Sequence, residues 1–504
     1  MNQLDNKIYQ FILIIDKQNG NAKLCTKSLV WQEISLNGTL NQFVLGHTID
    51  NIEGEFVVIE IHENSILITN DIFGAIPIYL YETTSCIAIT NNLNKLSEHT
   101  KIDTTINEQK LYEYFIFGYQ INGNNSYYNS IKCIQTHFKI THSIGDNQTS
   151  INVTNSTIYD TLNEKETSEN SIAKILQTET AIGLKGLFGR SAFLLSGGSD
   201  SLMGALLCKS ITPDTQMESA TFGLSQTLDI VVAKNRAKTL IGYSHNEFLI
   251  DQLIISPNDY IKHSIAQNGF GTLSSVYYSF FLNYLKESGF SNAIFSDHFE
   301  CTRKEIPDES FLRERYTTPQ TVVNRYIRHL DKYNTYYNAA IVDIKDFYKE
   351  NEWYKFYFQD RNIRGQSWKM VLCNDIGMVK YNLSNHHYFL KKNYDLVNNQ
   401  KLFTYESIIN QYFNQLNFDE KELNVNTNNL KSIPISPREM IYNQAEFFIN
   451  LLGNKLADDI LSHFKTDLII NDIKNKSIPV NGEWLILRLL NIIIFNLHIK
   501  YRIA

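Results

Sequence analysis

Several residue types and patterns are scarce in this chain of 504 residues. Only 8 prolines and 23 glycines occur, which argues against a collagen-like or Pro/Gly-rich disordered chain. Six cysteines lie far apart, with no CxxC pair and no cysteine and histidine group at zinc spacing, so we expect reduced thiols. No long basic run is present, and 46 Lys+Arg against 53 Asp+Glu give a formal charge of −7. Nucleic acid is therefore not expected as a main partner.

Long apolar runs are also missing. The first 16 residues, MNQLDNKIYQFILIID, contain no basic segment followed by a long apolar core, as a secretory signal would. The apolar stretch 484–499 is interrupted by Arg488, Asn491 and Asn496, and it predicts a buried helix rather than a membrane span. We expect no membrane span and a cytoplasmic location.

The residues that are present divide the chain into two parts. Short apolar or alternating runs at 11–16, 55–62, 65–70, 76–81 and 86–90 predict stacked antiparallel sheets in a domain spanning 1–150. A helix is expected over 107–117. Residues 151–170 are rich in Asn, Thr, Ser and Glu, as linkers are.

A second domain is expected over 171–504. Its runs at 191–195, 218–222, 247–250 and 293–295 alternate with helical patterns at 201–209, 229–240 and 274–288. This order predicts an α/β domain with a parallel sheet. From about residue 307 onward, Tyr, Asn and Ile recur at helical spacing, and we expect a helical C-terminal part whose aromatic residues form core faces.

The sharpest local signal is the run Ser196-Gly197-Gly198-Ser199-Asp200-Ser201, between the strand 191–195 and a helix expected to begin near Ser201. Paired glycines let backbone N–H groups approach an anion, and the helix N-terminus favours negative charge. A carboxylate at Asp200 would repel a bare phosphate, so it suggests a Mg²⁺ ion that neutralises the phosphates. The alternative is a helix capped by Ser199 or Asp200 after a glycine turn. We favour an ATP pyrophosphate-binding loop.

This loop resembles that of the N-type ATP pyrophosphatases. The segment 220–224, followed by Asp229, Gly242, His245 and Glu247, is similar to the second strand and helix of asparagine synthetase-type domains. The N-terminal segments 53–56, 70–79 and 87–91 resemble the glutaminase-like domain of the same family, in the same order.

The resemblance implies an Ntn-hydrolase-like α+β domain of stacked antiparallel sheets, followed by an adenine-nucleotide α-hydrolase-like α/β domain. It also implies that the strand backbone near Phe222 holds the adenine. The expected ATP contacts are Leu195, Ser196, Gly197, Gly198, Ser199, Asp200, Ser201, Phe222 and Ser296.

The chain departs from that family at three places. Asn2 stands where glutamine-hydrolysing members have a nucleophilic Cys, so we expect no glutaminase activity and a structural role for Cys25. The run 294–302 lacks the family's glycines, which leaves Asp297 and Glu300, with Asp200, as the expected Mg²⁺ ligands.

The third departure is a missing lysine. No lysine stands in the segment 433–447 where the family places one that contacts phosphate, and Lys431 or Arg438 is a candidate substitute. The expected catalytic residues are Asp200, Glu300 and Arg438. Gly377 falls where the family has a substrate-facing turn.

Two classes of function remain open. The first is an ATP- and Mg²⁺-dependent amide-forming ligase that adenylates a carboxylate, couples it to an amine, and releases AMP and pyrophosphate. Its substrate would be a peptide, as in the Cys-less lasso-peptide cyclases with their precursor peptide and its protease, or a small carboxylate, as in β-lactam synthetases or amino-acid amide synthetases. The second is a catalytically reduced relative that binds nucleotide or a partner without turnover.

Overall fold

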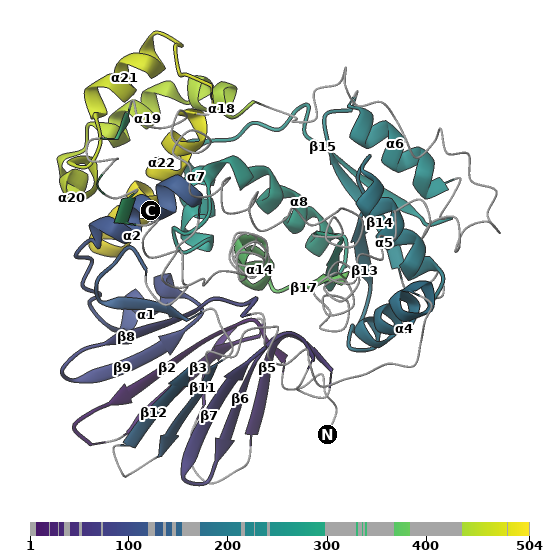
Figure 1. The fold of residues 1–504 in the computed structure, drawn as a ribbon, viewed down its shortest axis with the longest axis horizontal. Coiled ribbons are helices and arrows are strands. Elements are labelled where there is room, and N and C mark those ends of the chain that lie inside the picture. The colour runs from purple at the N-terminus through teal and green to yellow at the C-terminus, as the bar shows by residue number, and fades with distance from the viewer. Residues whose placement is uncertain are drawn as a thin grey trace.

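The structure is a computed structural model, shown in Figure 1. It describes residues 7–19, 21–28, 30–34, 41–49, 53–71, 74–118, 126–134, 138–143, 148–153, 172–212, 217–225, 227–238, 242–297, 329–330, 335, 338–339, 367–383, 436–480 and 482–502. The predictions for Asn2, Glu300 and Lys431 concern residues outside these ranges.

The N-terminal part is a sandwich of two six-stranded sheets. One has the order β1-β5-β6-β7-β11-β12 and the other β10-β8-β9-β2-β3-β4; all described neighbours are antiparallel except β1 and β5. Their facing apolar side chains, such as Phe11 and Ile59, form one core, because alternate residues of each strand point to the same face. The strands are β1 (Lys7–Ile8), β2 (Gln10–Asp16), β3 (Ala22–Lys27), β4 (Trp31–Ile34), β5 (Asn41–Ile49), β6 (Glu53–His62), β7 (Ser65–Asn70), β8 (Ile78–Glu82), β9 (Cys86–Thr90), β10 (Ile131–Ile134), β11 (Phe138–Ser143) and β12 (Gln148–Val153).

This part agrees closely with the expected stacked sheets. The expected strands 65–70 and 86–90 match β7 and β9, and the other three differ by up to two residues at an end. The helix α2 (Glu108–Phe117) begins after Asn107, whose side chain caps it by accepting from the N–H of Lys110, and α1 (Leu93–His99) precedes it. The expected boundary at residue 150 cuts β12, which pairs with β11 as far as Val153.

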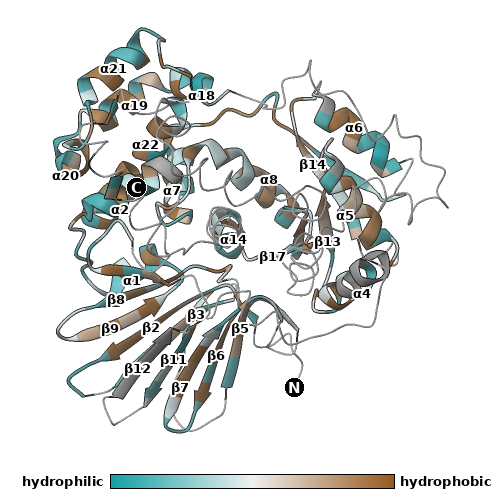
Figure 2. Ribbon diagram, in the orientation of Figure 1, coloured by the Kyte–Doolittle hydropathy of each residue, from teal (hydrophilic) through white to brown (hydrophobic). Residues whose placement is uncertain are grey.

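The second part is built on a parallel five-stranded sheet, as expected, in the order β15-β14-β13-β16-β17. Its strands are β13 (Ser191–Leu194), β14 (Met217–Gly223), β15 (His245–Leu249), β16 (Asn292–Phe295) and β17 (Val379–Asn382). Its helices are α4 (Ile172–Lys185), α5 (Ser199–Lys209), α6 (Leu228–Arg236), α7 (Pro257–Ala266), η2 (Leu273–Ser275), α8 (Val276–Glu287) and α14 (Ser367–Ile376). Helix α6 carries hydrophilic and hydrophobic residues side by side (Figure 2), as a surface helix does.

Two expectations about this part need correction. Strand β17 lies where only helices were expected, because the four residues VKYN are too short a pattern to indicate a strand. The Gly377 turn, with a φ of +74°, precedes the amino end of β17. The strands are parallel, so this turn lies at the sheet edge opposite the SGGSDS loop.

The C-terminal helices pack against the N-terminal part. They are α18 (Pro437–Asn443), α19 (Ala445–Leu452), η9 (Lys455–Ala457), α20 (Asp458–Leu461), α21 (Thr466–Lys474) and α22 (Gly482–Tyr501). Helix α22 shares a core with α2 and with side chains of β8 (Figure 1). Among the described helices, α22 alone is long and apolar enough to resemble a membrane span. However, 78 % of its 18-residue apolar stretch is buried inside the protein. The expected buried helix is confirmed.

Candidate functional site

The sheet order places a cleft at a predictable position. The chain runs from β13 outward to β14 and β15, then returns to the other side of β13 for β16 and β17. In open parallel sheets, ligands bind beyond the carboxyl ends of the strands at such a reversal. A cleft of about 270 Å³ lies there, lined by residues at the ends of three strands, including Leu195, Gly223 and Ser296.

The SGGSDS loop leaves β13 at the inner wall of this cleft. The N–H of Leu195 donates to the carbonyl of Ala220 at 2.9 Å, which extends the pairing with β14 up to the loop. The Ser201 hydroxyl lies 3.0 Å from the Ser196 hydroxyl and accepts from the Ser196 N–H at 3.0 Å. Ser196 and Ser201 both line the cleft. The Ser201 hydroxyl also donates to the Gly198 carbonyl at 3.0 Å, so it braces the loop that borders the cleft.

Helix α5 begins earlier than expected, and this bears on the capping alternative. Its first residue is Ser199, and its N-cap is Gly198, which has no side chain to cap the helix. The first N–H groups of a helix have no intrahelical acceptor, and they attract anions when no side chain caps them. The alternative of a helix capped by Ser199 or Asp200 is therefore wrong, because the cap residue is Gly198.

Two side chains of helix α6, one acidic and one basic, form hydrogen bonds with the loop. The Asp229 carboxylate accepts from the N–H of Gly197 at 3.0 Å. The buried Arg236 guanidinium donates to the carbonyls of Gly197 at 2.8 Å and of Gly198 at 3.1 Å. These bonds fix the loop. Three of its N–H groups already have acceptors: the Ser201 hydroxyl for Ser196, the Asp229 carboxylate for Gly197, and the Ser196 hydroxyl, 3.1 Å away, for Gly198.

Aromatic rings form the opposite wall. Phe222 on β14 lies with its ring centroid 4.8 Å from that of Tyr278 and 4.9 Å from that of Phe281, both on α8. All three residues line the cleft. Adenine is a flat aromatic base whose faces stack on aromatic rings, and such a wall suits it.

A lysine that the sequence analysis missed pairs with Asp297, which lines the cleft. Both carboxylate oxygens of Asp297 accept from the Lys369 ammonium at 2.8 Å. The ammonium also lies 5.3 Å from the ring centroid of Phe295, 5.6 Å from that of Trp368 and 5.8 Å from that of Tyr278. Burial alone would lower the pKa of Lys369, but Asp297 outweighs it and the pKa lies above its usual value. The lysine is therefore charged and neutralises Asp297.

Two residues that the sequence analysis predicted to be catalytic do not line the cleft. Asp200 lies in the first turn of α5 and is not among the cleft-lining residues. Arg438 pairs with Glu483 at 3.3 Å on the C-terminal helices and does not line the cleft either. Within the described ranges, no group of three or more acidic, histidine or cysteine side chains is arranged to hold a metal ion.

The N-terminal sandwich shows the surroundings of Cys25. This residue is buried on β3, and burial raises the pKa of its thiol. A thiol with a raised pKa is a poor nucleophile at neutral pH. A structural role for Cys25 fits these observations.

Comparisons with known proteins add little. No family model and no curated protein sequence matches the chain. A solved glutamine-dependent NAD⁺ synthetase from Acinetobacter baumannii, in complex with adenosine diphosphate, aligns over 63 % of this chain and 69 % of its own, with 10 % identity and a TM-score of 0.18. A likeness this weak does not assign a fold or a function.

Proposed function

We propose that the cleft binds ATP and that the protein is an AMP-forming carbon–nitrogen ligase. The observation that carries the proposal is the position of the SGGSDS loop. It joins a buried parallel strand to a helix without a side-chain cap, at the strand-order reversal of the sheet. The N-terminus of α5, which no side chain caps, lies there beside Ser196 and Ser201, and this suits a pyrophosphate group.

The proposed reaction has two steps. A substrate carboxylate oxygen attacks the α-phosphorus of ATP, the bond from that phosphorus to the bridging oxygen breaks, and pyrophosphate leaves with the electron pair. An amine then attacks the acyl carbon of the adenylate, loses a proton, and displaces AMP. The loop holds the departing phosphates, while the wall at Phe222 and Tyr278 receives the base.

Lys369 supports this proposal because it removes a repulsion. An ionised Asp297 alone would oppose a polyphosphate in the same cleft, and the ammonium 2.8 Å from its oxygens cancels that charge. The same pairing weakens the expectation that Asp297 binds Mg²⁺. The described residues do not form a protein-built magnesium site, so no step is assigned to the ion.

The substrate class is a finer proposal. We propose a peptide carboxylate as the acyl donor, as in lasso-peptide cyclases, with a small carboxylate as the alternative. Support comes from the resemblance together with Asn2 at the position of the glutaminase nucleophile, which removes glutamine as the expected nitrogen source.

One observation favours the second candidate, nucleotide binding without turnover. The Asp229 carboxylate accepts from the N–H of Gly197, so a phosphate must displace it to use that donor. The two candidates share ATP binding and differ in chemistry.

ATP–pyrophosphate exchange separates them. Labelled pyrophosphate should enter ATP when a suitable peptide or amino-acid carboxylate is present. Ser201→Ala should reduce exchange, because the Ser201 hydroxyl holds the loop by accepting from the Ser196 N–H and donating to the Gly198 carbonyl. Ser210→Ala is the matched control, since Ser210 ends the same helix and its hydroxyl donates to the Leu207 carbonyl. ATP binding without exchange for any substrate supports the non-catalytic candidate, and absence of ATP binding refutes both.

A further inference from the structure

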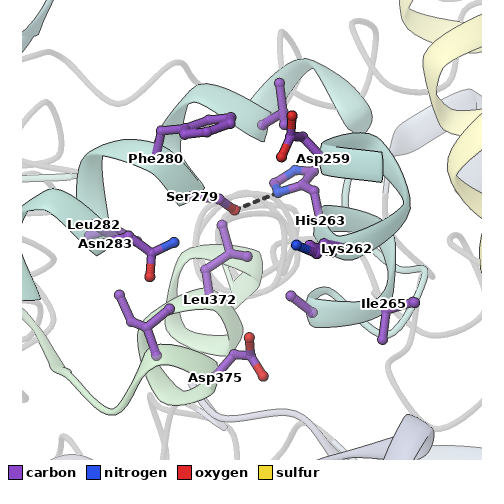
Figure 3. Close-up of a pocket in the computed structure, with 13 residues that line it drawn as sticks. Asp259, Lys262, His263, Ile265, Ser279, Phe280, Leu282, Asn283, Leu372 and Asp375 are labelled. Carbon is purple, nitrogen blue, oxygen red and sulfur yellow. Dashed lines mark hydrogen bonds between the residues drawn. The ribbon is translucent and has the colours of Figure 1, made fainter. Parts of the chain in front are cut away.

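A second cavity, of about 350 Å³, lies among helices α7, α8 and α14 (Figure 3). It shares no lining residue with the SGGSDS cleft. Helix α8 presents a different face to each space, and α14, which packs against α8, lines only the cavity. Tyr278 faces the cleft, whereas its neighbour Ser279 lines the cavity.

A carboxylate on α14 dominates the chemistry of this cavity. Asp375 lies across it from Asp259 and His263 of α7 in Figure 3. One Asp375 oxygen accepts from Gln10 at 3.2 Å, and Lys27 donates to the Asp375 main-chain carbonyl at 3.2 Å. Burial raises the pKa of this carboxyl despite the nearby lysine. Among the described residues, no lysine or arginine forms an ion pair with its carboxylate oxygens.

The other polar groups do not supply the missing cation. His263 is fully buried, and desolvation lowers its pKa to about 4, so it is neutral at pH 7. Its ring nitrogens lie 2.7 Å from the Ser279 hydroxyl and 2.9 Å from the Ser275 hydroxyl. Lys262 also lines the cavity, but it is exposed, so water and salt screen its charge. Asp259 adds a second carboxylate, which accepts from the Ser256 N–H and hydroxyl.

The rest of the lining is mainly apolar, and includes Val276, Leu282 and Leu372. A cavity of a few hundred Å³ with an apolar lining and few polar anchors is typical of small-molecule sites. We propose that this cavity binds a small primary amine with an apolar body, whose ammonium group pairs with Asp375. This inference does not depend on ATP binding in the cleft.

Three probes with the same phenyl group test it on the full chain by ligand-observed NMR titration: benzylamine, its neutral isostere benzyl alcohol, and the anion benzoate. Benzylamine should bind at least tenfold more tightly than the other two, because a charge-assisted hydrogen bond to a buried carboxylate is worth that much. Asp375→Asn should remove this preference and leave the binding of benzyl alcohol unchanged. Saturating ATP should not displace benzylamine.

A second variant guards against misfolding of the first. Ala266 lines the cavity, so Ala266→Phe should fill it and abolish benzylamine binding while circular dichroism remains unchanged. The inference is overturned if the three probes bind equally, if none binds, if both variants still bind benzylamine as the native chain does, or if ATP displaces it. Failure to bind ATP would refute the proposed ligase and leave the amine result standing.

Discussion

The two glycines of the loop should respond differently to alanine, because their surroundings differ. A Cβ on Gly197 would lie 2.7 Å from the Asp229 carboxylate and 3.2 Å from its Cα. A Cβ on Gly198 would meet only the Ser196 hydroxyl, at 3.3 Å. Gly198 has a φ of −76° and a ψ of 153°, which any residue adopts. Gly197→Ala must therefore disturb the fold locally, whereas Gly198→Ala fits the empty loop.

The magnitudes follow from these contacts. Overpacking against Asp229 should cost Gly197→Ala about 1–3 kcal/mol of unfolding free energy. Gly198→Ala should change it by less than about 1 kcal/mol. The added methyl lies beside the Ser196 hydroxyl, a cleft-lining group, and should keep a phosphate from the loop N–H groups. Losing one charge-assisted bond of about 1.5–3 kcal/mol weakens binding at least tenfold.

Urea unfolding measures the first effect, and calorimetric titration with α,β-methylene-ATP, which resists cleavage, measures the second. Ser210→Ala serves as the control for both. The reasoning fails if Gly198→Ala binds the analogue as tightly as the native chain. It also fails if Gly197→Ala unfolds at the native urea concentration, because the clash with Asp229 would then be absent.

Four further outcomes are expected. Asp229→Asn should raise pyrophosphate affinity in EDTA several-fold by calorimetry, since it removes a negative charge that competes for a loop N–H; unchanged affinity would contradict this. Lys369→Met should destabilise the fold by about 3 kcal/mol, and adding Asp297→Asn should restore part of that in urea unfolding. Burial holds His263 neutral, so stability should fall by about 3 kcal/mol as pH drops from about 6.5 to about 4, and His263→Asn should flatten this profile. The raised pKa of Asp375 means that its ionised form opposes folding, so Asp375→Asn should be at least as stable as the native chain at pH 7, and any gain should disappear below about pH 3.8 in thermal melts.

Features set by neighbouring residues were predictable from the sequence. The strands β7 and β9 alternate in polarity or run apolar between turns, and their bounds were found exactly. The loop at Ser196 was found because paired glycines after an apolar strand form a short, ordered pattern. The start of α5 was missed by two residues because serine and aspartate suit both a cap and a first helical turn.

Features set by distant residues were not predictable. Lys369 and Asp297 are 72 positions apart and meet only because α14 lies beside the end of β16. A single Trp-Lys pair in a stretch of mixed composition gives no sign of this. The amine cavity depends in the same way on the packing of three helices. The β17 strand is stabilised by its parallel pairing with β16, which the four residues VKYN do not reveal by themselves.

Helix α14 contributes a charged side chain near the cleft and another to the cavity, and its packing fixes where both lie. It is enclosed by several structures: Met370 packs into the core of the N-terminal sandwich, and Leu372 and Cys373 pack beside the parallel sheet. Most of this helix is buried, yet it carries Lys369 to Asp297 at the cleft and the half-buried Asp375 to the cavity. Six residues at about 100° each separate these two side chains by about 240° around the helix, so they reach different spaces. Because burial makes both charges costly, their positions are hard to explain by stability alone. The packing that holds α14 therefore sets the positions of both groups, which is the arrangement that precise binding requires.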